Sequence, residues 1–266
     1  MNVQHFSPAI QLRQLIKHYW LMEIDSSKKH HEELLFPVGA IEIIFHLQTP
    51  FLRINNDIWI PERKAFIEGQ QSGILRVKQK GVMKTIGITF YPWATTFFYN
   101  THPISFTDNS FDINDIDNSI YQLSEKLQNN TDNNMIPMLC NSYFLSFLKN
   151  KFHKHNSTDL AIINAFKQPN ENFTVSEFEK DWSFSSKFFE KKFKELVGVS
   201  AGELIKKRRM NIVLKKTLNQ EYKSLTDVAY AAGYYDQSHF IKDFQTFFQT
   251  SPKILKKEHS LLKHFI

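Results

Sequence analysis

The chain has 266 residues, enough for two domains of ordinary size, and a formal net charge of +6. Its single cysteine, Cys140, excludes an intrachain disulfide and is consistent with a reducing compartment. The N-terminus lacks a basic start followed by an apolar segment, and no run approaches the roughly 18 apolar residues needed to span a bilayer. We therefore expect a cytoplasmic protein that makes no membrane contact.

The first part of the chain, up to about residue 115, predicts short β-strands. β-Branched and aromatic residues occur in brief runs that glycine and proline interrupt. The expected strands cover residues 40–47, 58–60, 65–68, 73–77 and 85–90. Residues 13–20 are compatible with a strand or a helix. Many short strands with frequent turns favour a small barrel or sandwich.

Helical spacing replaces this pattern at residue 118. Ile120, Leu123 and Leu127 share one helical face, and a second helix contains Met135 and Phe147, with Cys140 near its apolar side. A polar run follows at residues 151–158 and is typical of an interdomain linker. These patterns divide the chain into a domain at 1–150, helical over 118–150, the linker, and a second domain at 159–266.

The second domain is expected to be helical throughout, which makes the chain an α+β protein. A helix is expected at 159–168 after Ser157 and Thr158, and a final helix from Pro252 onward. Helices at 174–181 and 185–195 form one helix-turn-helix, 174–195. Ser200 caps a linking helix at 201–218, and a second helix-turn-helix follows at 226–248.

The second helix-turn-helix has the clearest local signals. Thr226 is expected to cap its first helix and Asp236 its second. Gly233 lies where the chain must reverse, a position that favours positive φ. Phe240, Ile241, Phe244, Phe247 and Phe248 follow helical spacing and predict the apolar face of the second helix, which leaves polar and basic side chains facing outward. This arrangement is typical of a helix that enters the major groove of DNA.

Charge is unevenly distributed between the two halves. Residues 158–266 hold 18 lysines and arginines against 13 acidic residues, whereas the earlier residues are almost neutral. A basic C-terminal half suggests an anionic partner, although a solvated lysine-rich surface explains the charge equally well.

The segment 225–252 resembles the signature of the AraC/XylS family of bacterial transcription regulators. The matching residues are Leu225, Val228-Ala229, Gly233-Tyr234, Asp236-Gln237-Ser238-His239-Phe240, Phe244 and Ser251-Pro252. Gln249 departs from the pattern, which usually has glycine there. The first unit departs more, with Glu179 at a position that is usually Ala and Ser183 at the usual turn glycine.

Residues 19–25, 34–47 and 81–95 look like the cupin-like sensory domain of one branch of this family. The resemblance implies a β-barrel or cupin-like N-terminal domain. It also implies sequence-specific binding of double-stranded DNA, more often for activation than repression. RNA polymerase, a small-molecule effector and a second copy held through the N-terminal domain are possible partners. No cofactor and no catalytic residue are expected.

The expected DNA contacts lie on the two recognition helices. The set comprises Lys187, Glu190, Lys191, Lys194, Gln237, Ser238, His239, Lys242 and Gln245. Gln237 suits adenine, Lys242 suits guanine or a phosphate, and Glu190 either accepts from cytosine or pairs with a nearby lysine. Lys192 and residues 206–209 are further candidates for phosphate contact, with Arg209 expected to be structural. Trp20, Phe45, Trp59 and Trp93 either line an effector cavity or fill the core.

Three other classes of protein have specific requirements. A DNA-repair alkyltransferase needs a reactive thiolate, and Cys140 lies in an apolar helix. A metal-dependent cupin enzyme needs converging histidines, but His30 and His31 are adjacent in an extended segment, and His153 and His155 lie in the linker. An architectural protein that binds DNA without sequence preference does not require the exposed polar face formed by Gln237, Ser238 and His239. The sequence therefore favours a transcription regulator without enzymatic activity.

Overall fold

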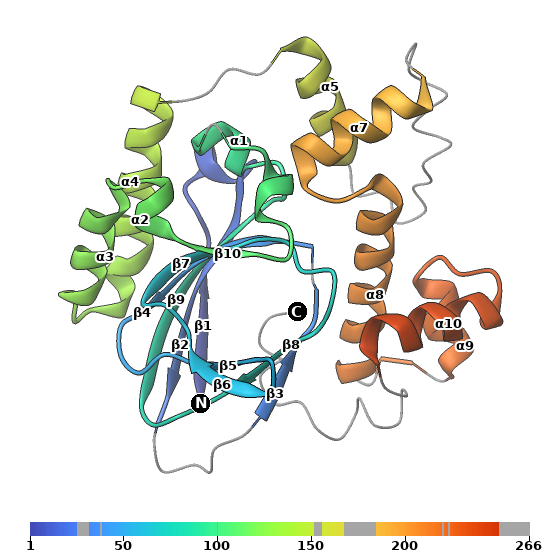
Figure 1. Cartoon of the computed structure of the whole chain (residues 1–266), viewed down its shortest axis with the longest axis horizontal. Coiled ribbons are helices and arrows are strands. Elements are labelled where there is room, and N and C mark those ends of the chain that lie inside the picture. Colours follow the sequence, from blue (N-terminus) through green and yellow to red (C-terminus); the bar gives the residue numbers. More distant parts are fainter. Residues whose placement is uncertain are drawn as a thin grey trace.

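A computed structural model describes residues 1–25, 32–37, 39–99, 101–151, 156–167, 185–219, 221–222 and 224–249. β-Strands dominate the first part and helices the second (Figure 1). No helix within those ranges is long and apolar enough to cross a membrane. The predicted helices at 174–181 and beyond Pro252, together with Glu179 and Ser183, lie outside the described residues.

The strands form two antiparallel sheets rather than a closed barrel. The larger sheet has the order β1-β2-β9-β4-β7-β10 and the smaller β3-β8-β5-β6. Their bounds are β1 Asn2–Phe6, β2 Ile16–Ile24, β3 Glu32–Leu35, β4 Ile41–His46, β5 Leu52–Asn55, β6 Ile58–Pro61, β7 Ala65–Glu68, β8 Leu75–Lys78, β9 Met83–Phe90 and β10 Ser110–Asp112. The α+β class is confirmed, but the described strands of the two sheets do not pair with one another, so the expected barrel does not close.

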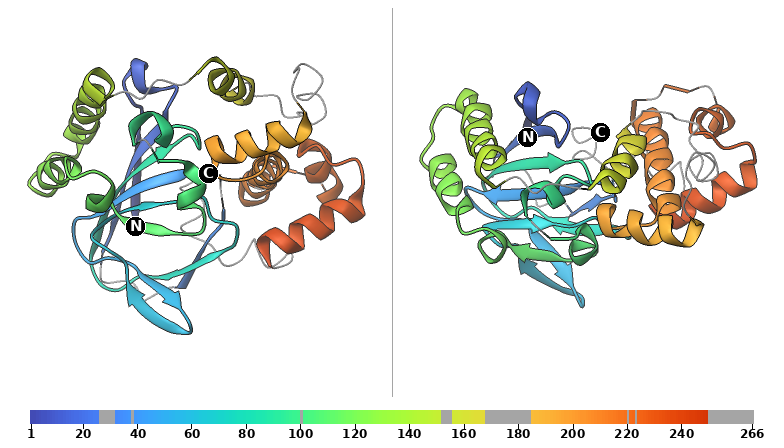
Figure 2. Two further views of the ribbon diagram at one scale, coloured as in Figure 1. Left: turned by 45° about the horizontal axis from the view of Figure 1, so that its top comes forward. Right: turned by 90° about the horizontal axis from the view of Figure 1, so that it is seen from above.

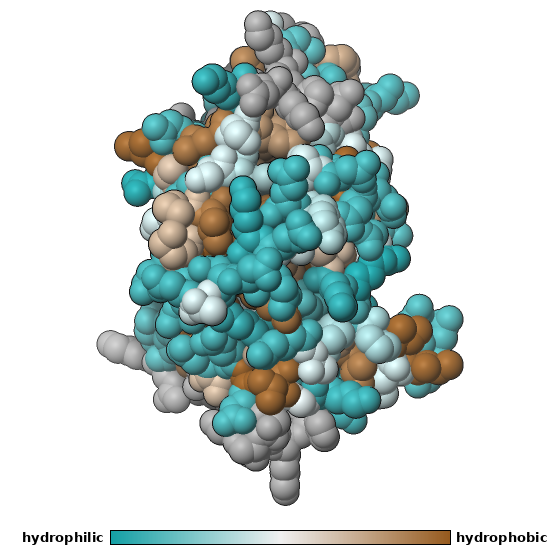
Figure 3. Space-filling model, turned by 90° about the vertical axis from the view of Figure 1, so that its left-hand side faces the viewer, coloured by the Kyte–Doolittle hydropathy of each residue, from teal (hydrophilic) through white to brown (hydrophobic). Residues whose placement is uncertain are grey.

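The larger sheet has two different faces because side chains alternate along each strand. Ile43, Ile67 and Ile88 lie side by side in register on one face, and the helices of the N-terminal part cover it (Figure 1). These helices are α1 Thr95–Phe98, α2 Ile113–Ile116, α3 Ile120–Gln128 and α4 Ile136–Lys151, with short 3-10 turns at Ile10–Leu12, Pro103–Phe106 and Asn133–Met135. Seen from the side of α3 and α4, the surface is mostly hydrophilic (Figure 3).

The opposite face of the larger sheet packs against the smaller sheet. Trp20 and Met22 of β2 form a small apolar cluster with Val77 of β8 and Phe51. Gly87 of β9 lies directly beneath the Trp20 ring, where an added Cβ would come within 2.0 Å of the indole. The larger sheet therefore needs glycine at this position for the tryptophan to lie flat.

The C-terminal part consists of helices arranged around one long helix (Figures 1 and 2). Its described helices are α5 Ser157–Lys167, α7 Ser186–Val197, α8 Ala201–Asn219, α9 Leu225–Ala231 and α10 Gln237–Phe248. Ser185 caps α7, and the Ser200 hydroxyl accepts from Glu203 N at 3.2 Å at the start of α8, which confirms the predicted Ser200 cap. At the start of α5 the Asn156 side chain accepts a hydrogen bond from Asp159 N at 2.8 Å. The cap of this helix is therefore Asn156 and not Ser157 or Thr158.

The two parts of the chain are in direct contact. The Thr107 hydroxyl donates to Gly198 O at 2.8 Å, and the Gln70 amide donates to Val197 O, so the end of α7 is held by the N-terminal part. Gly39 lies against α8, and a Cβ there would be 3.3 Å from Leu204 Cδ1.

Phe36, which follows β3, is buried in the core formed by α8, α9 and α10. Its ring contacts the Phe248 ring at 5.0 Å between centroids. A residue of the N-terminal part therefore completes the packing of the second helix-turn-helix.

Candidate nucleic-acid interface and ligand cavity

The second helix-turn-helix is formed by α9 and α10 and has well-defined ends. Gly233 has φ +76°, as the predicted reversal requires. Asp236 accepts from Ser238 N at 3.0 Å and from His239 N at 3.2 Å, which confirms it as the cap of α10. The predicted Thr226 cap is wrong. Ser224 caps α9 in a reciprocal pair with Asp227, a Ser-x-x-acid pattern that the sequence already contained.

The side chains of α10 separate into a buried face and an exposed face. Phe240, Phe244, Phe247 and Phe248 are buried in the local core, as predicted. The predicted contacts on this helix are all exposed: Gln237, Ser238, His239, Lys242 and Gln245.

Ile241 was predicted to join the buried face of α10, and this is wrong. The side chain is 43% exposed and lies on the polar side of the helix. Tyr235, in the turn before α10, is 87% exposed. Helical spacing alone did not distinguish Ile241 from the phenylalanines, because it lies at the border of the apolar stripe.

Asp243 fixes the orientation of α10 on α8. Its carboxylate lies 2.6 Å from Lys206 Nζ and accepts from the Tyr234 hydroxyl at 3.0 Å. His239 Nε2 lies 3.6 Å from the same carboxylate. Lys206 is therefore paired within the protein, and His239 has a longer contact with the same carboxylate while its side chain stays exposed.

Two further basic residues of α8, Lys207 and Arg209, are also engaged. The Arg209 guanidinium lies over the Tyr234 ring at 5.3 Å, in agreement with the expected structural role. Lys207 is buried, with Glu203 at 3.5 Å, and desolvation lowers its pKa. Of the four basic residues 206–209, Lys206, Lys207 and Arg209 thus support the fold.

The first recognition helix, α7, shows a similar division. Lys187, Lys191 and Lys194 are exposed, and Glu190 is half-buried. Within the described residues Glu190 makes no ion pair, which leaves its carboxylate available to a ligand. Lys192 instead lies 3.2 Å from Asp159 and 3.6 Å from Glu195, so it ties α7 to α5.

A cavity of about 430 Å³ lies between the two sheets and extends to α8. Apolar side chains from both sheets form most of its wall, including Trp20, Met22, Leu35, Phe36, Ile44 and Phe51. Asn211, Ile212 and Lys215 of α8 complete it. The cavity is therefore shared between the two parts of the chain.

Only one of the four predicted effector residues, Trp20, lines this cavity. Phe45 and Trp93 belong to the core on the opposite face of the larger sheet, and Trp59 lies on β6 beneath Lys78. Of the two alternatives, the core one therefore holds for Phe45 and Trp93, and the alternation along β4 explains the position of Phe45. Ile41, Ile43 and Phe45 face the helices, whereas Glu42, Ile44 and His46 face the cavity.

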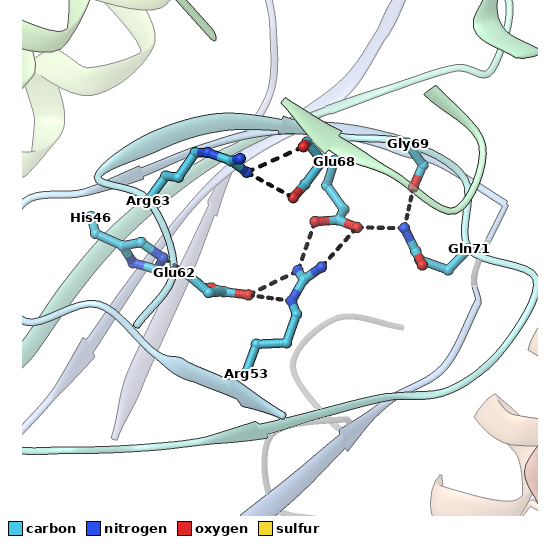
Figure 4. A network of polar contacts seen from close by, with 8 residues as sticks. His46, Arg53, Glu62, Arg63, Glu68, Gly69 and Gln71 are labelled. Carbon is cyan, nitrogen blue, oxygen red and sulfur yellow. Dashed lines mark hydrogen bonds and ion pairs between the residues drawn. The ribbon is translucent and has the colours of Figure 1, made fainter. Parts of the chain in front are cut away.

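A polar network closes one side of the cavity (Figure 4). Arg53 Nη2 lies 2.8 Å from Glu62 and 2.6 Å from Glu68, and His46 Nε2 lies 3.1 Å from Glu62. Desolvation raises the pKa of Glu68 to about 7, against the opposing effect of Arg53. The Arg53 guanidinium is thus engaged by two carboxylates.

The cations at the α8 end of the cavity have a different environment. Neither Lys17 nor Lys215 makes an ion pair within the described residues. Burial, reinforced by the charge of Arg208, lowers the pKa of Lys17 to about 8, and Glu42 opposes this. Desolvation also lowers the pKa of Arg208. Positive charge from both parts of the chain therefore gathers here, and the Glu42 carboxylate on the cavity wall offsets part of the charge of Lys17.

Features that enzymes of the alternative classes require are not assembled in the described residues. No group of three or more His, Cys, Asp or Glu side chains among them could hold a metal ion. His30, His31, His153 and His155 lie outside those residues. Cys140 is buried, and desolvation raises the pKa of its thiol far above the ordinary value, which disfavours a reactive thiolate.

Comparisons with known proteins agree with this arrangement. Residues 180–258 match a helix-turn-helix domain family, and residues 4–112 match a domain of unknown function. An uncharacterized HTH-type transcriptional regulator of Haemophilus influenzae is 28% identical over 101 residues, which cover 38% of this chain and 34% of that protein. The match thus spans about a third of the relative's length.

Solved structures of ToxT from Vibrio cholerae are similar over most of their length. One has 13% identity and a TM-score of 0.47, covering 89% of this chain and 97% of ToxT. A second, with unsaturated fatty acid bound, has 11% identity and a TM-score of 0.42, covering 90% and 94%. Residues 180–258 thus form a helix-turn-helix domain, and within it α9 and α10 carry the segment that resembles the AraC/XylS signature.

Proposed function

We propose that this chain binds double-stranded DNA in a sequence-specific manner and regulates transcription in response to a small acidic ligand. The exposed polar face of α10 is the observation that carries the first part. A capped helix presents Gln237, Ser238 and Lys242 together, while four phenylalanines anchor its other side. Such a face supplies hydrogen-bonding groups for base edges on a rigid support.

Base and phosphate contacts are assigned by reach and chemistry. Gln237 pairs with adenine through two hydrogen bonds, and Lys242 reaches guanine or a phosphate. Lys187, Lys191 and Lys194 on α7 lie along an exposed stripe and suit phosphates. Glu190 accepts from a cytosine amino group. His239, already near Asp243, suits a phosphate, and Gln245 lies on the same exposed side of α10.

Both recognition helices connect to α8, which sets their spacing. Adjacent major grooves on one face of DNA are about 34 Å apart, so one chain covers two successive groove segments. Bending of the DNA accompanies binding if α7 and α10 are closer than one full turn of the duplex.

The cavity supports the ligand part of the proposal. Its wall suits an apolar body, and Lys17 and Lys215, which make no ion pair within the described residues, suit a carboxylate or similar acid at the α8 end. Arg53 is already saturated by Glu62 and Glu68 and so contributes little to binding an acid. A ligand here touches Phe36 and α8 at once, which connects occupancy of the cavity to the second helix-turn-helix.

Further parts of the proposal come from the family resemblance. Activation, through contact with RNA polymerase in the cytoplasm, is the expected mode, and a homodimer formed through the N-terminal domain is the expected state. A promoter-reporter assay distinguishes activation from repression by the sign of the change.

The proposal is tested by selecting duplexes from a randomised library with the full-length chain at near-physiological salt. We expect a motif that spans two adjacent major grooves. Binding without any enriched motif, with steep salt dependence, would instead indicate a nonspecific DNA-binding protein.

The ligand part is tested separately with probes of equal length that carry a carboxylate, an alcohol or an ammonium group. The carboxylate probe should raise the melting temperature most, and Lys17→Met should remove that preference. An equal response to all three head groups contradicts an acidic ligand without affecting the DNA-binding proposal.

A further inference from the structure

The exposed face of α10 contains one apolar side chain among polar ones. Ile241 lies one turn after Gln237 and one turn before Gln245, and both glutamines are exposed. Lys242 is its direct neighbour. Whereas the phenylalanines of the helix are at most 8% exposed, Ile241 is 43% exposed. A β-branched aliphatic side chain thus lies in the middle of the surface assigned to base contacts.

The packing of the helix explains why Ile241 points outward. Asp243 is tied to Lys206 on α8 and to Tyr234, and the Phe240 and Phe244 rings meet at 5.8 Å in the core beneath. Residues 240, 243 and 244 therefore define the inward side of the helix. With 100° between successive residues, residue 241 is directed away from α8 and cannot join the core without turning the whole helix.

The major groove offers few apolar partners. Base edges there present hydrogen-bond donors and acceptors, apart from the 5-methyl group of thymine. An isoleucine that faces a polar base edge leaves the donors and acceptors of that edge without partners. An isoleucine that faces the thymine methyl group instead buries apolar surface on both sides of the contact.

Resting on the proposed function, we infer that Ile241 selects a thymine in the operator by contact with its 5-methyl group. One helical turn separates Ile241 from Gln237, and a turn advances about 5.4 Å along the helix. This advance corresponds to one or two base-pair steps, so the thymine lies within two base pairs of the base bound by Gln237. The same contact accommodates 5-methylcytosine at that position but gains nothing from uracil.

Replacement of single thymines by deoxyuridine tests this inference, because it removes the methyl group and leaves base pairing unchanged. The operator is first obtained by selection with the full-length chain. Each thymine in the half bound by α10 is then replaced in turn, and the dissociation constant is measured. We expect one position at which the wild type loses about fourfold in affinity, the factor that corresponds to one buried methyl group.

The variants Ile241→Ala and Ile241→Val show whether Ile241 is responsible. Ile241→Ala should bind the thymine and deoxyuridine operators equally, whereas Ile241→Val should retain part of the difference. Tyr121→Ala, which removes an exposed aromatic side chain on α3, should keep the full difference. Melting curves confirm that each variant is folded, as expected for exposed positions.

Two results would overturn the inference. One is a wild type that shows no deoxyuridine penalty anywhere in the α10 half-site. The other is a penalty that persists unchanged in Ile241→Ala. If the wild type binds all duplexes alike, the proposed sequence-specific binding is itself wrong. The initial selection shows this, because it then yields no operator.

Discussion

At the scale of single residues, Gln249 occupies a backbone conformation that favours glycine. It ends α10 with φ +49° in the left-handed region. A left-handed residue with a Cβ costs about 1 kcal/mol relative to glycine. The departure from the family signature at Gln249 therefore keeps the turn but reduces its stability.

We predict that Gln249→Gly raises the free energy of unfolding by about 1 kcal/mol. For a chain of this size the melting temperature should rise by about 2–4 °C. Thermal unfolding followed by circular dichroism measures this change. The matched control, Gln245→Gly in the interior of α10, should lower stability instead, and a gain for both variants would contradict the conformational explanation.

Lys17 leads to a prediction about pH. Burial lowers the pKa of Lys17 from 10.5, its ordinary value in the unfolded chain, to about 8 in the folded state. As pH rises, the folded state therefore loses this proton before the unfolded state does. The contribution of Lys17 to stability is thus unfavourable below pH 8 and improves as pH rises from about 8 to 10.5.

Lys17→Met should accordingly stabilise the ligand-free protein at pH 7 by about 1–2 kcal/mol, less than the full shift implies because part of the side chain is exposed. The gain should shrink toward pH 10. Urea titrations of wild type and variant at pH 7 and pH 10 measure both values. A gain that does not change with pH would show that packing, rather than charge, is responsible.

Single residues were predicted from the sequence only where local chemistry sets their role. Asp236, Ser200 and Gly233 have roles that depend on the adjacent backbone, and these were predicted. Phe45 and Trp93 depend on which face of a strand is covered, and this is decided by elements far along the chain. The sequence therefore left open whether these aromatics line a cavity or fill the core, and the covering elements decide it.

At the scale of elements, the Asp236 cap connects the fold of α10 to DNA binding. Its carboxylate accepts from two backbone amides at the start of the recognition helix. Gln237 and Ser238 lie in this first turn, so their positions depend on the cap.

We predict that Asp236→Ala lowers stability by about 1 kcal/mol and weakens binding to the selected operator. Asp236→Asn should retain most of both, since the amide oxygen also caps. Melting curves and fluorescence anisotropy measure the two effects. Loss of affinity in Asp236→Asn equal to that in Asp236→Ala would indicate a direct role of the charge rather than capping.

The sequence predicted elements well where one face of each is apolar. The strands β4, β7 and β9 and the helices α3, α8 and α10 were expected within a few residues, because their buried faces repeat with a regular period. β1, β3 and β5 were missed. Their residues are mostly polar or mixed, and pairing with neighbouring strands, rather than burial of a face, holds them in place. Pairing partners distant in sequence leave no local pattern.

At the scale of the whole molecule, Phe36 joins the two parts of the chain. It is buried among the side chains of α8, α9 and α10 and also lines the cavity. Phe36→Ala should cost about 3–5 kcal/mol, as for other large-to-small changes in a core.

Hydrogen exchange distinguishes this effect from general destabilisation. We expect Phe36→Ala to increase amide exchange in α9 and α10 more than in α3, which lies in a different part of the core. Ile10→Ala, at an exposed position, should change neither. Equal acceleration in α3 and α10 would show that Phe36 supports the fold as a whole and not the second helix-turn-helix in particular.

The contact at Gly39 limits how such a protein can be assembled from parts. Gly39 has φ +71°, and a Cβ there would lie 3.3 Å from Leu204 Cδ1, so a larger residue would strain the backbone and crowd α8. A chimera that joins this N-terminal half to the DNA-binding half of another regulator would place unmatched surfaces together at the cavity. We therefore expect a substitution at Gly39, or at the facing side of α8, to need a compensating change on the other side of this contact.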